Sequence, residues 1–183
     1  MTHFPVTNSN LSATHLGLFL QENYALSKDA KCQIIKAGIN DTYFITDDNG
    51  KFVFRVYSLS WRTKMEIEEE IRLLNQLKEN GISISYPLPD KESNYIQTLN
   101  APEGDRFAVL FTFAAGEKQH IISEETHFQI GQLIARLHKI TIHQRLNRID
   151  YTPEVILMDS LNKVSAFLSS DTEEMHFMKS AQS

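Results

Sequence analysis

Between residues 32 and 57 the sequence consists of short β-favouring runs, and this segment constrains the fold more than any other. The runs are Cys32–Lys36, Thr42–Thr46 and KFVFRVY at 51–57. DDNG at 47–50 is a hairpin signal, because Asn49 and Gly50 tolerate positive φ. The segment therefore predicts three consecutive antiparallel strands, with AGIND (37–41) as the loop between the first two.

Helical periodicity lies on both sides of this strand-rich segment. Apolar residues after Ser12 predict an amphipathic helix from about 12 to 24, with Ser12 as its cap. A second helix is predicted from about 61 to 79, opened by Ser60 and stopped by Gly81. Glutamates in its first half suit the positive end of the helix dipole.

Two further strands are predicted downstream. Pro87 and Pro89 mark a loop or an edge strand, because proline removes a ladder donor. The two strand runs are Tyr95–Leu99 and Arg106–Phe113, joined by the turn-rich NAPEGD. The second run is almost wholly apolar, which predicts a buried strand rather than an edge.

After Gly116 only helical patterns follow. Ser123 begins one helix, Thr152 with Pro153 begins another, and Asp171 caps a short last helix. The order is therefore helix, three strands, helix, two strands and then helices, which is an α+β arrangement.

Composition excludes several classes of protein. Hydrophobic residues at 42% and charged residues at 22% are typical of a globular protein. The net charge of -5 argues against nucleic acid as the main partner, because phosphate binding needs a basic surface. A single cysteine, Cys32, fits a reducing cytoplasm. No apolar run reaches the ~18 residues that would predict a membrane span.

Arg55 is the first candidate functional residue, because it stands inside an apolar strand. Alternation places Val53, Arg55 and Tyr57 on one face, and a buried cation there needs an anionic partner. Glu70 of the following helix is a suitable partner, and a kinase small lobe uses such a pair to direct positive charge at nucleotide phosphates. The alternative is a solvent-facing Arg55 and a surface glutamate, and spacing alone leaves both open.

Two backbone segments are weaker candidates. AGIND could bring N–H groups close to a phosphate, although an ordinary hairpin turn explains the same letters. LFTFAAG at 110–116 could present backbone N–H and C=O groups to a flat ligand, although a plain strand-to-helix connector also accounts for it. The seven histidines show no metal-ligand spacing.

In their order and spacing, five stretches resemble the aminoglycoside phosphotransferase family, a protein-kinase-like group that includes choline kinases, type II homoserine kinases and bacterial stress-response kinases. The stretches are GINDTYFI (38–45), FVFRVY (52–57), EEEIRLLNQLKENGI (68–82), AVLFTFAAG (108–116) and IGQLIARLH (130–138). Together they span about 100 residues, more than half of the chain.

The resemblance implies a protein-kinase-like small lobe followed by the first helices of an incomplete helical C lobe. Residues 1–30 would form an N-terminal helical lead. Residues 31–116 would form the small lobe, a five-stranded antiparallel sheet with one helix, together with the hinge. Residues 117–183 would begin the C lobe.

The resemblance also implies roles for residues at the phosphate end of a nucleotide site. Gly38, Ile39 and Asn40 would be the short substitute for a glycine-rich phosphate loop. Arg55 would hold the α- and β-phosphates, and Glu70 would orient Arg55. Lysine is the usual kinase choice at this strand position, but arginine also bridges carboxylate and phosphate.

At the adenine end, the resemblance implies four further contacts. Val53 would cover the adenine, and Phe111 would line the back of its pocket. Thr112 and Ala114 would offer the hinge C=O and N–H to the adenine edge. The implied cofactor is ATP, with magnesium arriving as MgATP.

One departure from the family is severe. The family's catalytic loop has the pattern H-G-D-x-x-x-x-N, followed by an Asp that binds magnesium, and nothing in this sequence matches it. Those parts supply the base and the metal ligands, so this chain is not expected to transfer phosphate efficiently. The interpretation is the N-terminal portion of a kinase that phosphorylates an alcohol group of a small molecule or protein.

Two other hypotheses stay open. The chain could be a non-catalytic kinase-like module that binds nucleotide or a partner, or an unrelated α+β binding domain. In either kinase reading, residues 123–180 would expose apolar helix faces, which predicts poor solubility, partial molten character or self-association.

Overall fold

The computed structural model describes residues 6, 8–117, 121–165, 167 and 172–180. By its internal contacts the chain divides into two compact units, Met1–Asn147 and Arg148–Ser183. Within the described residues, none of the helices is both long enough and apolar enough to cross a membrane.

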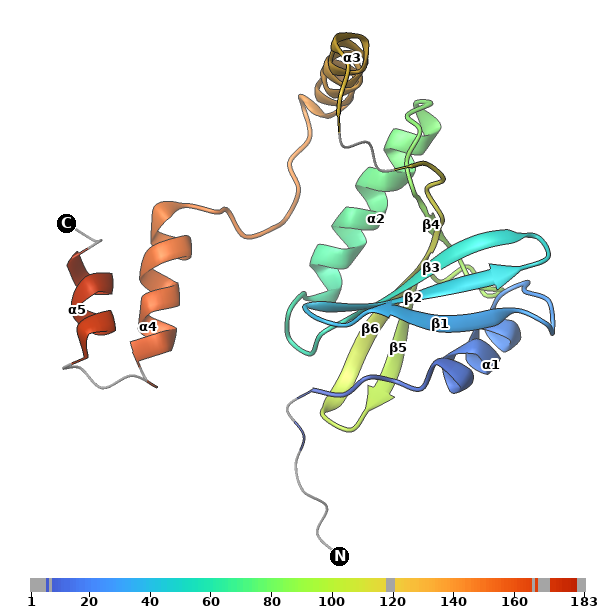
Figure 1. Ribbon diagram of the computed structural model, residues 1–183, viewed down its shortest axis with the longest axis horizontal. Helices are drawn as coiled ribbons and strands as arrows, with labels where there is room; N and C mark the ends of the chain where they lie inside the picture. Colours follow the sequence, from blue (N-terminus) through green and yellow to red (C-terminus); the bar gives the residue numbers. More distant parts are fainter. Residues whose placement is uncertain (1–5, 7, 118–120, 166, 168–171, 181–183) are drawn as a thin grey trace, which may run out of the picture. The chain divides into compact units, whose positions relative to one another are not determined.

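The first unit is built on one antiparallel sheet (Figure 1), whose strands run in the order β1-β2-β3-β6-β4 with β5 paired to β6. The strands are β1 (Lys31–Lys36), β2 (Asn40–Asp47), β3 (Gly50–Tyr57), β4 (Pro87–Leu88), β5 (Ile96–Ala101) and β6 (Gly104–Thr112). The three consecutive antiparallel strands and the two downstream strands are confirmed. The segment at Pro87 and Pro89, predicted as a loop or an edge strand, forms the two-residue edge strand β4 beside β6. The described sheet therefore has six strands and not the five predicted.

The tight turn between β2 and β3 agrees with the DDNG signal. Asp47 pairs with Gly50 in the register, and the Asp47 carboxylate accepts a hydrogen bond from the Asn49 N–H at 3.1 Å. Gly50 has φ 144°, a value that favours glycine. Asn49 does not have positive φ, so Gly50 alone uses that tolerance in the turn.

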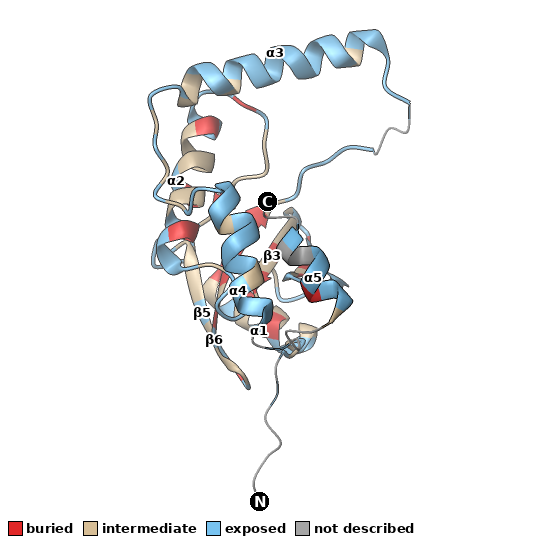
Figure 2. Ribbon diagram, turned by 90° about the vertical axis from the view of Figure 1, so that its left-hand side faces the viewer, coloured by how far each residue is buried: buried red, intermediate tan, exposed pale blue. Residues whose placement is uncertain are grey.

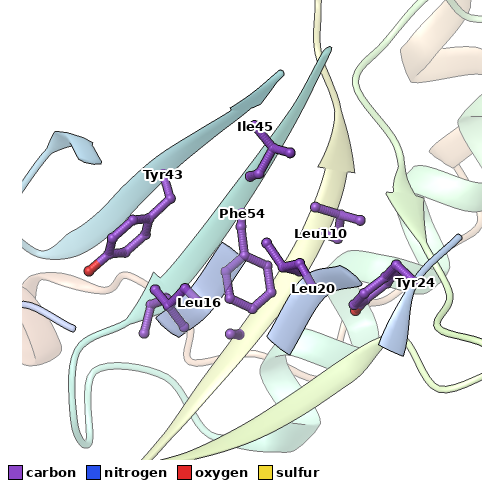
Figure 3. Packing of buried hydrophobic residues seen from close by; sticks show 9 residues of the cluster. Leu16, Leu20, Tyr24, Tyr43, Ile45, Phe54 and Leu110 are labelled. Carbon is purple, nitrogen blue, oxygen red and sulfur yellow. The ribbon is translucent and has the colours of Figure 1, made fainter. Parts of the chain in front are cut away.

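One of the two buried apolar clusters lies between the sheet and α1 (Ala13–Asn23), whose cap is Ser12 as predicted. Leu16 and Leu20 of α1 pack against Phe54 of β3, and Leu110 of β6 lies beside them (Figure 3). Phe54 is fully buried, since strand alternation turns it away from the face that carries Arg55. The α1 face of the sheet is therefore committed to packing.

The opposite face is covered in part by the next helix. Tyr57, Val109 and Phe111 of the sheet form a second buried cluster there with Ile67 and Ile71 of that helix. The region around Val53 and Arg55 on the same face is only half-buried.

Helix α2 (Lys64–Glu79) begins three residues later than predicted, because Thr63 rather than Ser60 caps it. The Thr63 N–H donates to the Glu66 carboxylate at 2.9 Å, and the Glu66 N–H donates to Thr63 Oγ1 at 3.2 Å, which is a capping box. At the other end, Gly81 has φ 71° and donates to the Lys78 carbonyl at 2.9 Å. The predicted glycine stop is confirmed.

The capping box predicts a pH-dependent contribution to stability. Hydrogen bonding from the Thr63 backbone lowers the pKa of Glu66, so its contribution is full above the unfolded pKa of about 4.3 and is lost as pH falls through the folded value. Glu66→Ala is expected to lower the free energy of unfolding by about 1 kcal/mol at pH 7. Urea unfolding at pH 7 and pH 3 measures the free energy of unfolding of wild type and variant. Glu66→Gln is the control, because the glutamine amide oxygen can still accept the hydrogen bond from the Thr63 N–H. Equal stability of wild type and Glu66→Ala at pH 7 would contradict it.

The helices after residue 120 bury little of their apolar surface. Helix α3 (Glu124–Thr141) begins at its predicted cap, Ser123, and has no buried residue (Figure 2). The second unit contains the π-helical η1 (Glu154–Met158), α4 (Asp159–Ser165) and α5 (Glu173–Ser180). The Thr152 hydroxyl accepts from the Val155 N–H at 3.4 Å, as expected of a helix start. Asp171, the predicted cap of the last helix, lies outside the described residues.

Candidate functional site

The face of the sheet opposite α1 carries the candidate site. Phe44, Val53 and Phe111 are cross-strand neighbours on β2, β3 and β6, and Arg55 is the next residue of β3 on the same face. Phe111 is buried, whereas Val53 and Arg55 are half-buried. The structure therefore brings Val53, Arg55 and Phe111 together on one partly open surface.

Arg55 and Glu70 form an ion pair. Arg55 Nη1 lies 3.0 Å from Glu70 Oε1, and the two side chains are 35% and 26% exposed. The guanidinium carbon of Arg55 also lies 4.8 Å from the centre of the Phe111 ring, within reach of a cation–π contact. Arginine has five N–H donors, and this bond to Glu70 uses one of them, so the group can hold its carboxylate and still meet an anion.

Tyr57 also belongs to this cluster, although no role was predicted for it from the sequence. Its hydroxyl donates to Glu70 Oε2 at 3.3 Å. Burial, and then the nearby Glu70 charge, raise the pKa of Tyr57 to about 12, so the phenol keeps its proton near neutral pH. Strand alternation already placed Tyr57 on the same face as Arg55. The sequence did not indicate that the Tyr57 hydroxyl would reach Glu70 on α2. Glu70 is therefore held from two sides.

The segment proposed as a phosphate loop is shorter than predicted. Gly38 and Ile39 lie between β1 and β2, but Asn40 and Asp41 belong to β2, where Asn40 pairs with Tyr57. A Cβ added to Gly38 would meet no atom within 4 Å, and Gly38 does not have positive φ. Within the described chain, neither crowding nor backbone conformation requires glycine at this position.

At the end of β6, the backbone carbonyl and N–H of Thr112, the residue predicted to lie in the hinge, already have hydrogen-bond partners within the chain. The Thr112 carbonyl accepts from Ser85 Oγ at 2.5 Å, and the Thr112 N–H donates to the Tyr86 carbonyl at 3.0 Å. A carbonyl has two lone pairs, so Thr112 retains one acceptor position for a ligand. Ala114, just beyond the strand, is exposed. Phe113 lies between them and packs edge-on against Phe44, with ring centres 5.3 Å apart.

A buried pair of charges near the loop was missed. Asp41 Oδ2 and Arg106 Nη2 are 2.8 Å apart, and both side chains are fully buried. From the sequence, Asp41 was predicted to lie in a loop, and Arg106 was predicted only as the first residue of a strand. Period-two alternation from Tyr43 and Ile45, which face α1, was the signal that would have turned Asp41 inward.

Two further features concern ligands. Across the described residues, no group of three or more His, Cys, Asp or Glu side chains could hold a metal ion. A surface pocket lies between α2 and the approach to β5, and its apolar lining is Ile71, Tyr95 and Ile96. It is on the same face of the sheet as Arg55, because Ile96 pairs with Val109 and Val109 pairs with Arg55.

Comparison with curated proteins finds relatives of similar sequence. An uncharacterized protein of Synechocystis is 29% identical over 174 residues, which is 93% of this chain and 48% of the relative. A homoserine kinase of Methylobacillus flagellatus is 26% identical over 162 residues, 88% of this chain and 48% of the kinase. The chain spans about half the length of these relatives.

Solved structures with the same fold are kinases and phosphotransferases. A microcompartment-associated aminopropanol kinase superposes with a TM-score of 0.65 at 19% identity, over 80% of this chain and 47% of the kinase. A spectinomycin phosphotransferase in complex with ADP and spectinomycin gives 0.61 at 18% identity, over 90% of this chain and 50% of that enzyme. These likenesses confirm the kinase-like α+β fold.

The family itself is identified from the sequence match. The phosphotransferase enzyme family matches residues 31–160, which is more than half of the chain and includes the whole sheet and the Arg55–Glu70 pair. That match agrees with the family resemblance noted in the sequence and with the fold of the solved relatives. The chain belongs to the phosphotransferase enzyme family.

Proposed function

We propose that this chain forms the nucleotide-binding part of an ATP-dependent kinase that phosphorylates an alcohol group of a small molecule or protein. The observation that carries the proposal is the Arg55–Glu70 ion pair on the open face of the sheet, 3.0 Å apart and only half-buried. A guanidinium held by a carboxylate and still reachable is suited to nucleotide phosphates. The chain spans about half the length of its curated relatives. The kinase activity of a whole protein of that length is therefore also proposed here.

In this proposal, one group of residues binds the phosphates of the nucleotide and another binds its adenine. At the phosphate end, Arg55 binds the α- and β-phosphates, Glu70 orients Arg55, and Gly38, Ile39 and Asn40 border the phosphates. Magnesium arrives bound to the nucleotide, whose phosphates supply its first ligands. The uncrowded Gly38 supports this arrangement, since it leaves room beside the loop.

At the adenine end, apolar contact and backbone hydrogen bonds would hold the base. Val53 covers the ring and Phe111 closes the back of the site. The second lone pair of the Thr112 carbonyl accepts from the adenine amino group, and the Ala114 N–H donates to the ring. The half-buried Val53 and exposed Ala114 support these assignments.

The acceptor is proposed only as a class. Homoserine and aminopropanol, named in two of the similar proteins, each carry a hydroxyl and an amino group, which supports an alcohol acceptor. The acidic composition and the single cysteine support a cytoplasmic protein without nucleic acid as a partner.

Equilibrium binding tests the proposal. Isothermal titration with MgATP is expected to show one site per chain, bound more tightly than either adenosine or magnesium pyrophosphate. The reason is that ATP reaches both the apolar end and the Arg55 end, whereas each control compound reaches one. Absence of MgATP binding at millimolar concentration, or equal affinity for ATP and pyrophosphate, would contradict the proposal.

We also propose that the isolated chain self-associates through the apolar surface of α3. Four large side chains of α3 are 40% to 63% exposed: Phe128, Ile130, Leu133 and Ile134. Exposed apolar surface of this kind favours association. Sedimentation velocity is expected to show species above the 21.0 kDa monomer, and Phe128→Gln with Leu133→Gln to shift them toward monomer. Trp61→Gln, at a 48% exposed residue before α2, is the control. A monomeric wild type would contradict the proposal.

A further inference from the structure

Arg106 lies in the interior of the first unit and makes contacts in several directions. It is 1% exposed. Its Nε donates to the Tyr57 carbonyl at 2.9 Å, its Nη2 to Asp41 Oδ2 at 2.8 Å, and its Nη1 to the Ser9 carbonyl at 2.7 Å. Arg106 therefore joins the segment before α1 to the ends of β2 and β3.

Glu103 holds this guanidinium from the side of the N-terminal segment. Its Oε1 lies 3.4 Å from Arg106 Nη1, and its carboxylate accepts from the Ser9 N–H at 3.2 Å and the Ser9 hydroxyl at 2.7 Å. Burial acts to raise the pKa of Glu103, but the bonds from Ser9 and the Arg106 charge keep it below its usual value. Glu103 is therefore ionised at neutral pH, and Arg106 lies between two carboxylates.

Asp41 connects Arg106 to the loop. One carboxylate oxygen meets Arg106, and the other accepts from the Gly38 N–H at 3.4 Å. Gly38 and Ile39 have a second anchor in Ser58, whose hydroxyl donates to the Gly38 carbonyl and whose N–H donates to the Ile39 carbonyl, each at 3.3 Å. Ser58 directly follows Tyr57, whose carbonyl accepts from Arg106 Nε. Both anchors of the loop therefore lead back to one guanidinium.

A buried ion pair of this kind is poorly explained by stability alone. Removing two charges from water costs much of what their attraction returns, and apolar residues of similar volume often serve as well. A charged pair does fix position, because arginine donors and carboxylate acceptors meet only in a narrow range of geometries. The Asp41–Arg106 pair lies next to the Gly38–Ile39 loop. Side-chain packing does little to fix this loop, because Gly38 is uncrowded and Ile39 is exposed.

We infer that Asp41 and Arg106 are positioning residues that set the placement of the Gly38–Ile39 loop, with Glu103 holding Arg106 from the opposite side. The inference rests on the proposed function for its purpose, since the loop borders the nucleotide phosphates there. Its structural content is independent of any nucleotide: a change at Arg106 or Glu103 alters the loop, although neither residue contacts it.

Selective labelling of glycine with ¹⁵N reads the loop directly. The chain has seven glycines, so the spectrum contains few amide signals, and Gly38→Ala identifies the one of interest. In Asp41→Asn and Arg106→Lys, the Gly38 signal is expected to shift and its amide exchange to quicken by about tenfold. Phe54→Leu, a core change on the α1 face, is the control for lost stability and is expected to leave Gly38 in place. An unmoved Gly38 signal in folded Asp41→Asn and Arg106→Lys would overturn the inference.

Glu103→Gln decides the question should the other two variants fail to fold. It removes one charge at the far side of Arg106 and keeps the shape, so a shifted Gly38 signal supports transmission through Arg106, and an unmoved one overturns it. MgATP titration of the same variants is expected to give about tenfold weaker binding. Should wild type bind no nucleotide while Gly38 still shifts in the variants, the proposed function fails and the positioning of the loop stands.

Discussion

Phe54→Ala is expected to lower the free energy of unfolding by about 3–5 kcal/mol, the usual cost of removing a fully buried phenylalanine from a core. Phe54 is 0% exposed, and it lies where α1 meets the sheet, against Leu16, Leu20 and Leu110 (Figure 3). Its ring also approaches Phe19, with ring centres 6.4 Å apart. The change therefore removes contacts that no neighbouring side chain can replace.

Urea unfolding followed by circular dichroism measures the loss, and Phe113→Ala is the matched control. Phe113 is 39% exposed, so its replacement is expected to cost about 1 kcal/mol or less. A Phe54→Ala protein within 1 kcal/mol of wild type would contradict the packing of α1 on the sheet.

Arg55→Ala is expected to weaken MgATP binding by about 10- to 100-fold, because charge-assisted hydrogen bonds to phosphate are each worth about 1.5–3 kcal/mol. Arg55→Lys keeps the charge but loses the planar fork, so its affinity is expected to fall between those of wild type and Arg55→Ala. The effect on stability is expected to be small, since the Arg55–Glu70 pair is about a third exposed and partly screened by solvent.

Calorimetry of Arg72→Ala gives the matched comparison. Arg72 also belongs to a close ion pair, 2.8 Å from Glu69, but it is exposed and lies two residues beyond Glu70 along α2. Its removal is expected to leave MgATP affinity unchanged. Equal losses for Arg55→Ala and Arg72→Ala would show a general charge effect instead of a phosphate contact at Arg55.

Local sequence patterns were sufficient to predict most helices and strands and the Arg55–Glu70 ion pair. Alternation along residues 51–57 separated Phe54 from Arg55, and that separation put Phe54 in the core and Arg55 beside Glu70. Glu70 could be named because it lies on the next helix along the chain. Such contacts follow from sequence order.

Contacts between distant segments could not be predicted in the same way. The Asp41–Arg106 pair joins residues 65 positions apart, and which strand lies beside β3 decides whether they meet. The occupied carbonyl of Thr112 depends likewise on Ser85, 27 residues earlier. The helix start is a different case: the capping box of Thr63 and Glu66 was present in the sequence, and Ser60 was preferred in error.

Hydrogen–deuterium exchange of the chain with and without MgATP tests the central claim most directly, because it shows where a nucleotide binds. The account predicts slower exchange in three segments: residues 37–42 around Gly38, residues 52–57 around Arg55 and residues 110–116 around Thr112. Protection confined to the pocket of Ile71, Tyr95 and Ile96, or no protection at saturating nucleotide, would contradict it.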